Sequence, residues 1–370
     1  RLLSRDEKNP ELWKLKAEIE RAQGLFEEAA NALSEACKYA PNNKKLLSLQ
    51  GIVLYEAEKY SEAIDILGRV LSSDPQNGEL WKRKGAAHEA LMQYELASEC
   101  YEKASEFVQE DPDLIRRLGI SLYRSGKCAL SIPRLEQYLE VVPDDPEIWE
   151  MKGKALYNQG QFSPASAALS QAVLLKPVDT DLLFRYAQSL FKSGELDSAI
   201  PSLDQVLEKD PDNAKAWQLK AEIEQSLGRE EAAAHAVEEA LRQIPDDPVL
   251  LLSRVKTLYD SDTYSEALSL IRRVIDKAPD NNEAWLLYAE LLWITADHDA
   301  AAAALERILA ADDSNAHAWF LKADSLQNAG RFEEAAVAHE RTFSLGGDPS
   351  IGLLLSRKMR YLQQKNTPAS

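Results

Sequence analysis

The sequence predicts an all-α protein, a solenoid of antiparallel helix pairs, and two observations support this prediction. In residues 146–179, apolar and small side chains such as Trp149 and Gly153 recur at helical spacing, which indicates two amphipathic helices in tandem. The pattern returns every 34 residues from Pro10 to Pro349 without an insertion or deletion. Neither helix of such a pair can bury its apolar face alone, so neighbouring copies must cover it.

The pattern divides the chain into ten repeats, each with a first helix expected at about positions 2 to 14 and a second at about positions 18 to 30. In the repeat that starts at Pro146, Asp145 is the expected N-cap, Gly160 ends the first helix and Pro177 ends the second. The repeats begin at Pro10, Lys44, Gly78, Pro112, Pro146, Thr180, Ala214, Pro248, Asn282 and Ala316.

Several positions of the repeat are restricted to one kind of residue. Position 4 holds Trp or an aliphatic residue, position 8 is Gly or Ala except at Val255, and position 20 is Ala except at Ser131. A proline ends the second helix in seven repeats. This arrangement resembles the tetratricopeptide repeat. The resemblance implies a right-handed superhelix of antiparallel helix pairs, an α-α superhelix, whose first helices line a concave groove that usually binds a peptide or a partner helix.

The two ends of the chain differ from the repeat. Residues 10–349 are expected to form ten tandem repeats in one solenoid, and residues 1–9 to be the end of a preceding helix. Residues 350–365 are expected to form a capping helix, and residues 366–370 a frayed tail. Because the chain starts at Arg1 and no N-terminal cap is visible, we expect it to be a piece of a longer protein.

Composition excludes some classes of protein. The formal net charge of -18 argues against a nucleic-acid binder, since neutralising phosphates needs a basic surface. A membrane-spanning helix needs about 20 apolar residues, and no run approaches that length, so we expect no membrane insertion. The three cysteines, Cys37, Cys100 and Cys128, cannot all pair with one another and favour a reducing, cytoplasmic location.

The sequence predicts no catalytic, cofactor or metal site. His88 and Glu89 begin like a zinc-binding HExxH motif, but Met92 stands where the second histidine would be. His88 also falls at a core position of its repeat. The other histidines lie in different repeats or on different helices, and no glycine-rich loop follows a strand. We therefore expect no cofactor and no enzyme activity in this chain.

Candidate binding residues lie at the positions that line the groove in this family, namely 2, 5, 6, 9, 12 and 13, and all of these except position 2 are compared below. In repeats three to six these positions hold eight basic side chains against two acidic ones, whereas repeats seven to ten hold mostly acidic and apolar side chains. The predicted groove residues are Lys82, Arg83, Arg116, Arg117, Arg124, Lys154, Arg185 and Lys192 with Tyr123, Tyr157 and Phe191 in a basic half, and Tyr259, Leu286, Trp293 and Phe320 in an apolar half.

These residues also have a purely structural explanation. Lys and Arg favour helices and cover apolar surface, and aromatic residues at position 12 can pack between repeats. Solvation alone, however, gives no reason for the sign of the charge to change along one face. The chaperone-tail clamp of some family members is absent, because Lys82 is followed at position 9 by Ala86 and no repeat has asparagine there.

The sequence therefore predicts a non-enzymatic protein-interaction scaffold that holds a peptide or helix of a protein partner, with an acidic segment against the basic half. Two alternatives stay open. The chain is either the regulatory or substrate-recruiting arm of a larger enzyme, or an array that associates with itself through the apolar half.

Overall fold

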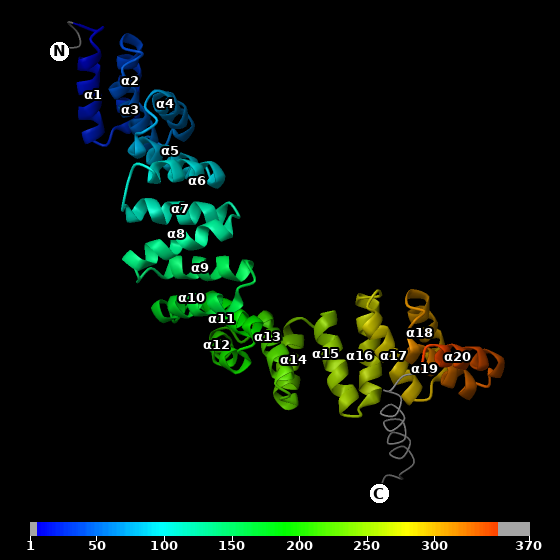
Figure 1. The fold of residues 1–370 in the computed structure, drawn as a ribbon. Helices are drawn as coiled ribbons and strands as arrows, with labels where there is room; N and C mark the ends of the chain where they lie inside the picture. The colour runs from blue at the N-terminus through cyan, green and yellow to red at the C-terminus, as the bar shows by residue number, and fades with distance from the viewer. Residues whose placement is uncertain (1–5, 347–370) are drawn as a thin grey trace. The chain divides into compact units, whose positions relative to one another are not determined.

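The computed structural model describes residues 6–346, and all its regular elements are α-helices, alternating first and second helices in tandem (Figure 1). The predicted all-α fold of repeated helix pairs is confirmed. The helices form two compact bodies, an N-terminal body up to Glu195 and a C-terminal body from Leu196, so the boundary falls inside the sixth repeat. The arrangement of all ten repeats as one solenoid stays a prediction.

The N-terminal body contains six first helices and five second helices. The first helices are α1 (Pro10–Ala22), α3 (Lys44–Glu56), α5 (Gly78–Ala90), α7 (Pro112–Arg124), α9 (Pro146–Asn158) and α11 (Thr180–Ser193). The second helices are α2 (Phe26–Tyr39), α4 (Tyr60–Ser73), α6 (Tyr94–Ser105), α8 (Cys128–Val141) and α10 (Phe162–Leu175).

The C-terminal body begins with a second helix and then continues the alternation. Its second helices are α12 (Leu196–Lys209), α14 (Glu230–Gln243), α16 (Tyr264–Lys277), α18 (His298–Ala311) and α20 (Phe332–Ser344). Its first helices are α13 (Ala214–Ser226), α15 (Pro248–Asp260), α17 (Asn282–Ile294) and α19 (Ala316–Asn328).

Each first helix begins one residue earlier than predicted, because an Asn or Asp side chain caps it directly. At α7, Asp111 Oδ1 accepts the backbone N–H groups of Asp113 and Leu114 at 3.0 and 3.3 Å. This satisfies two of the N–H groups that a helix start leaves without partners. Equivalent caps are Asn9, Asn43, Asn77, Asp145, Asp179, Asn213, Asp247, Asn281 and Asn315.

The predicted segments at the chain ends are described only in part. Residues 6–9 form a turn that leads into α1, so the expected helix end does not extend through them. Residues 1–5, the predicted capping helix at 350–365 and the predicted tail at 366–370 lie outside the described residues.

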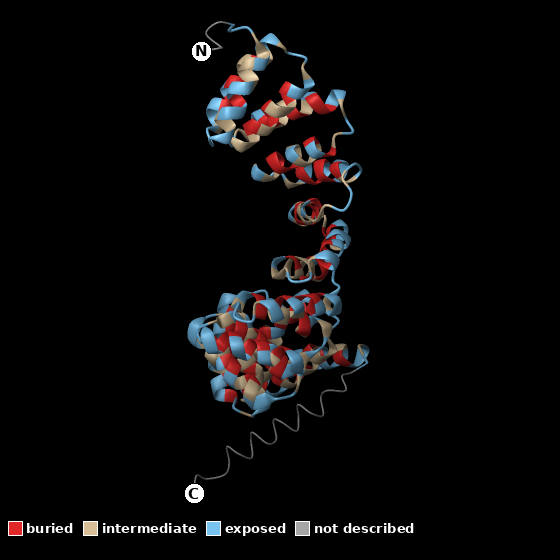
Figure 2. Cartoon of the chain, turned by 90° about the vertical axis from the view of Figure 1, so that its left-hand side faces the viewer, coloured by how far each residue is buried: buried red, intermediate tan, exposed pale blue. Residues whose placement is uncertain are grey.

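The core of each repeat depends on a close crossing between its two helices, at positions 8 and 24. A Cβ atom added to Gly153 would lie 2.5 Å from Cγ of Leu169, so the backbone of α9 lies directly against the α10 side chain. Gly119 meets Leu135 in the same way. Buried residues accordingly follow the inner faces of the helices within each body, while the outer faces are exposed (Figure 2).

Neighbouring repeats are joined by a recurring tryptophan contact. Trp149 Nε1 donates to the carbonyl of Pro143, which ends the preceding second helix, at 2.7 Å. Lys152, one turn further along α9, lies over the indole with its Nζ 5.0 Å from the ring centroid. The same indole-to-carbonyl bond is made by Trp13, Trp81, Trp217, Trp285 and Trp319.

The turn between the two helices of a repeat requires one residue in the left-handed conformation, at position 15. Gly160 fills it with φ of 73° and no atom near the place of a Cβ. Ala296 occupies the same position with φ of 67°. A side chain in this conformation costs about 1–2 kcal/mol, whereas glycine adopts it freely. Repeats with a non-glycine residue at this position are therefore locally strained.

We predict that Gly153→Leu lowers the free energy of unfolding by about 1–3 kcal/mol, because the new side chain overpacks the crossing against Leu169. Urea unfolding followed by circular dichroism measures the effect. Gly68→Ala is the control, since Gly68 is helical and its Cβ would meet only Lys84 Nζ, at 3.5 Å. The control should stabilise by up to about 1 kcal/mol. Equal midpoints for wild type and Gly153→Leu would contradict the crossing.

We predict that Ala296→Gly stabilises its repeat by about 0.5–1 kcal/mol, the relief of the left-handed strain less the entropy that glycine loses on folding. The reverse change, Gly160→Ala, should destabilise. Hydrogen exchange of the flanking helices measures both effects locally. Slower exchange in the Gly160→Ala variant would contradict the prediction.

Candidate functional site

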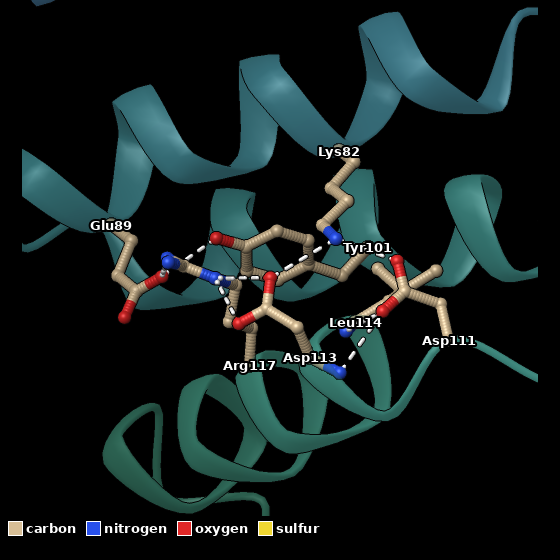
Figure 3. Close-up of polar contacts among 7 residues, drawn as sticks. All are labelled: Lys82, Glu89, Tyr101, Asp111, Asp113, Leu114 and Arg117. Atoms are coloured by element: carbon tan, nitrogen blue, oxygen red, sulfur yellow. Dashed lines mark hydrogen bonds and ion pairs between the residues drawn. The ribbon is translucent and has the colours of Figure 1, made fainter.

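Two predicted groove residues, Lys82 and Arg117, are held in a polar network between α5, α6 and α7 (Figure 3). Lys82 Nζ lies 2.6 Å from Asp111 Oδ2 and 3.0 Å from Asp113 Oδ2. Arg117 Nη1 lies 3.0 Å from Glu89 Oε2, which also accepts the hydroxyl of the buried Tyr101 at 2.6 Å. These two cations therefore join the third repeat to the fourth, which accounts for their presence without a partner protein.

The network changes the ionisation of its carboxyl groups. Burial acts against the change, but the hydrogen bond and ion pair with Lys82 hold the pKa of Asp111 below its usual value. The pKa of Asp113 is lowered too, since Lys82 and Arg117 together outweigh the effect of burial. Both carboxylates therefore stabilise the folded state in their charged form.

Two more predicted groove residues are engaged in the same manner. Arg116 lies 3.4 Å from both Asp145 and Glu147 at the start of α9. Arg124 donates to the Tyr94 hydroxyl at 3.2 Å and stacks on that ring. Like Lys82, Arg116 links position 5 to the helix start of the next repeat.

A pocket of about 330 Å³ opens on the faces of α7, α9 and α11, within the N-terminal body. It brings together four of the predicted groove residues from three successive repeats. Its lining consists of Tyr123, Lys154, Tyr157, Asn158, Leu169, Arg185, Gln188 and Ser189. The pocket combines two aromatic rings with two cations and several amide and hydroxyl groups, which suits recognition of a partly polar ligand.

The cations in this pocket differ in their pairing. Lys154 is in an ion pair with Glu150, one turn earlier on α9. The Arg185 side chain makes no ion pair or hydrogen bond with any residue of the described range 6–346, and neither hydroxyl of Tyr123 and Tyr157 is hydrogen-bonded there. Burial raises the pKa of Tyr123, while the Arg185 charge opposes the rise, which places the guanidinium near that phenol.

The remaining basic residues lie outside the pocket. Arg83 is exposed at position 6 of α5. Phe191 and Lys192 lie at the end of α11, where Lys192 Nζ is 5.4 Å from the Phe191 ring centroid. The structure thus divides the predicted basic half into a structural set at α5–α7 and a pocket set at α7–α11.

The prediction of an exposed apolar half is wrong. Trp293 is fully buried, and its Nε1 donates to Asp324 Oδ2 of the next first helix at 2.6 Å. Tyr259 is half-buried, with its hydroxyl donating to Glu290 Oε2 at 2.7 Å. Leu286 and Phe320 pack against the core of the C-terminal body and are not among its exposed apolar side chains. The position-12 side chains Trp293 and Tyr259 are covered because each bonds a carboxylate of the following repeat, whereas Leu286 and Phe320, at position 5, are partly buried against the core.

Besides Leu169 of α10, a buried core residue, three pocket residues escaped the sequence prediction, namely Asn158, Gln188 and Ser189. Asn158 and Gln188 stand at groove positions 13 and 9, but only charged, aromatic and large apolar residues had been selected there. Ser189 follows Gln188 and bonds its own helix through the Arg185 carbonyl at 3.0 Å. Taking every residue type at positions 9 and 13 would have found two of the three.

No group of three or more His, Cys, Asp or Glu side chains within 6–346 is arranged to hold a metal ion. His88 is buried and its Nδ1 lies 2.7 Å from Gln93 Oε1, a structural contact. The three cysteines are unpaired, and burial raises the pKa of Cys100 to about 11. None of the described helices has the length and apolar character needed to cross a membrane.

Three family models match successive parts of the chain. The TPR domain of cytochrome c-type biogenesis protein H matches residues 134–250, the tetratricopeptide repeat matches residues 252–313 and 295–343, and the YpiA-like C-terminal tetratricopeptide repeats match residues 81–145. With its tandem helix pairs, the chain is therefore a tetratricopeptide repeat protein. Domains of this class are generally interaction modules without catalytic activity. No curated protein matches the chain.

Among the solved structures similar to this chain, the first shares its fold. The structure of Naa15/Naa10 bound to HypK-THB is 14% identical with a TM-score of 0.52, and the match covers 96% of this chain but 66% of that one, slightly under two thirds. YrrB, described as a TPR protein with an unusual peptide-binding site, is 20% identical with a TM-score of 0.45, over 52% of this chain and 98% of its own. The C-terminal part of a TPR repeat-containing protein from Cytophaga hutchinsonii is 16% identical with a TM-score of 0.49, over 64% and 97%.

We predict that the free energy of unfolding falls as the pH drops below about 4, because the lowered pKa values of Asp111 and Asp113 give stability that is lost on protonation. Asp111→Asn keeps the helix cap but removes one of the two carboxylate partners of Lys82, so it should cost about 1 kcal/mol at neutral pH and reduce the acid dependence. Urea unfolding at neutral and acid pH measures both effects. Asp65→Asn, an exposed change on α4, is the control, and an equal loss there would contradict the role of the network.

Proposed function

We propose that this chain is a non-enzymatic protein-interaction scaffold that binds a segment of a protein partner along the first-helix face of residues 112–193. The observation that carries the proposal is the pocket lined by Tyr123, Lys154, Tyr157 and Arg185, which draws on three successive repeats. A segment lying across α7, α9 and α11 would contact all of them, and an extended or helical conformation would both serve.

The partner segment is proposed to be acidic where it meets the pocket. Arg185 carries an uncompensated charge at that place, whereas the cations near α5 are already paired with the chain's own carboxylates. Charge-assisted hydrogen bonds in a partly desolvated pocket contribute about 1.5–3 kcal/mol each, against about 0–1 kcal/mol for exposed pairs. A few such contacts are enough for micromolar affinity.

The alternatives from the sequence carry different support. An enzyme's regulatory or substrate-recruiting arm would use the same pocket, and it differs only in what is joined to residues 1–370. Self-association through an apolar half loses its central residue, because Trp293 is fully buried, and would have to use the partly buried Leu286 and Phe320. A cytoplasmic location stays part of the proposal, supported by the three unpaired cysteines. The acidic net charge of -18 supports a protein partner over a nucleic acid.

The test is a selection of peptides from a random displayed library on the intact chain, followed by affinity measurement by fluorescence anisotropy. Selected peptides should contain acidic residues, and Arg185→Glu should weaken them at least tenfold because attraction becomes repulsion. The difference between wild type and variant should narrow as salt rises, since salt screens charges outside the pocket. Arg69→Glu is the matched control, with the same charge change at an exposed position of α4. Peptides that bind Arg185→Glu as tightly as wild type would sink the proposal.

A further inference from the structure

Repeat positions 12 and 9 hold different residues in the N-terminal and the C-terminal body. Position 12 of one first helix faces position 9 of the next, and on α17 and α19 of the C-terminal body a carboxylate fills position 9. Glu290 on α17 accepts the Tyr259 hydroxyl at 2.7 Å, and Asp324 on α19 accepts the Trp293 indole at 2.6 Å. In these repeats the chain supplies its own acid to the aromatic donor.

In the pocket of the N-terminal body the aromatic donors are present but the acids are not. Tyr123 and Tyr157 occupy position 12, as Tyr259 does, yet the facing position-9 residues are Lys154 and Gln188. Neither tyrosine hydroxyl donates to a residue of the described chain. The hydrogen-bond donors of this contact are therefore present, but no acidic acceptor stands at the facing position 9.

The charge at position 6 changes together with position 9. In the C-terminal body, beside Glu290 and Asp324, position 6 is Leu287 and Leu321. Beside Gln188, position 6 is Arg185, a cation without an acid partner in the described range. Glu290 is met by the Tyr259 hydroxyl and by His317 Nε2 at 2.9 Å, and not by a side chain at position 6. Beside Gln188, where the chain has no carboxylate at position 9, position 6 supplies a cation instead. This exchange is what a site for an external carboxylate requires.

We propose that the pocket between α7, α9 and α11 binds a single carboxylate of the partner. This carboxylate accepts a hydrogen bond from Tyr123 or Tyr157, as Glu290 does from Tyr259, and pairs with Arg185. This inference rests on the proposed function and specifies its ligand. The carboxylate belongs to an Asp or Glu side chain or to a chain terminus, and an apolar group beside it would lie against the two tyrosine rings.

The pocket favours one negative charge over two. Arg185 and Lys154 carry two positive charges, and Glu150, which is paired with Lys154, carries one negative charge, so one positive charge remains. A carboxylate balances the remaining charge, whereas a phosphate dianion would lie near Glu150 without a second free cation. The site also differs from the chaperone-tail clamp of the family, because its groups stand at positions 6, 9 and 12 and no asparagine stands at position 9.

The first test uses small probes with the intact chain, read by saturation-transfer NMR. The probes are 3-phenylpropionate, its amide, and phenyl phosphate. The carboxylate should bind at least tenfold more tightly than the amide and no more weakly than the phosphate. An amide that binds equally well, or a phosphate that binds tenfold more tightly, would overturn the inference.

The second test places a carboxylate of the chain itself in the pocket. Gln188→Glu places a carboxylate at position 9 of α11, where it can accept the Tyr157 hydroxyl and pair with Arg185, and should weaken 3-phenylpropionate at least tenfold with helix content retained. Gln171→Glu adds the same charge on the outer face of α10 and should have no effect. Undiminished binding by Gln188→Glu contradicts the inference.

A third variant tests the hydroxyl alone. Tyr123→Phe should weaken the carboxylate about fivefold, whereas Tyr55→Phe, a position-12 tyrosine outside the pocket, should leave it unchanged. Equal effects of the two changes would count against the site. Acetyl-Phe-Glu-amide and acetyl-Phe-Gln with a free terminus identify the source, since binding by either supports a carboxylate site and binding by neither overturns it.

The outcomes separate this inference from the proposed function. Displayed peptides could lose affinity with Arg185→Glu and yet not be displaced by 3-phenylpropionate. That result would support the scaffold function and contradict the carboxylate site. If small carboxylates bind in the pocket but displayed peptides bind Arg185→Glu as tightly as wild type, the carboxylate site stands and the proposed scaffold function at this face is contradicted.

Discussion

The close crossing of the two helices in a repeat is the constraint on which the other features depend. Gly153 lets the backbone of α9 touch Leu169, and the small residue at position 8 does the same in the neighbouring repeats. Because that contact fixes which side of the first helix faces inward, positions 5, 6, 9 and 12 turn away from the partner helix. The crossing itself therefore constrains those positions less, and the pocket residues Lys154, Tyr157, Arg185 and Gln188 stand there.

The same freedom also serves stability, which is why groove positions cannot be assigned to binding by charge alone. Lys82 and Arg116, both at position 5, pair with the Asp that caps the next first helix. One carboxylate thus stabilises a helix start and joins two repeats. A solenoid is held by contacts between neighbours, so such pairs contribute to cohesion. Arg185 differs from these cations, because its side chain makes no ion pair with a residue of the described range 6–346.

The sequence predicted the fold closely and the site only in part. The period of 34 residues and the caps at Asp111 and Asp145 determine helix starts to within a residue. Burial at position 12 is harder to predict from the sequence, because it depends on a residue 31 positions later. Trp293 is covered by Asp324, and Tyr259 by Glu290. A helical pattern within one repeat does not contain this pairing. Reading position 12 against position 9 of the next repeat would recover it.

Charge on the whole chain and charge in the pocket act on a partner at different ranges. The net charge of -18 repels an acidic segment at long range, and this repulsion is screened beyond about 8–10 Å at physiological salt. The proposed contact with Arg185 would form only at short range, inside a pocket that the Tyr123 and Tyr157 rings also line. Moderate salt therefore speeds encounter while weakening the final contact, so selectivity comes from the pocket's shape and donors and not from attraction at a distance. A chain this acidic can distinguish a partner with one well-placed carboxylate from one with many.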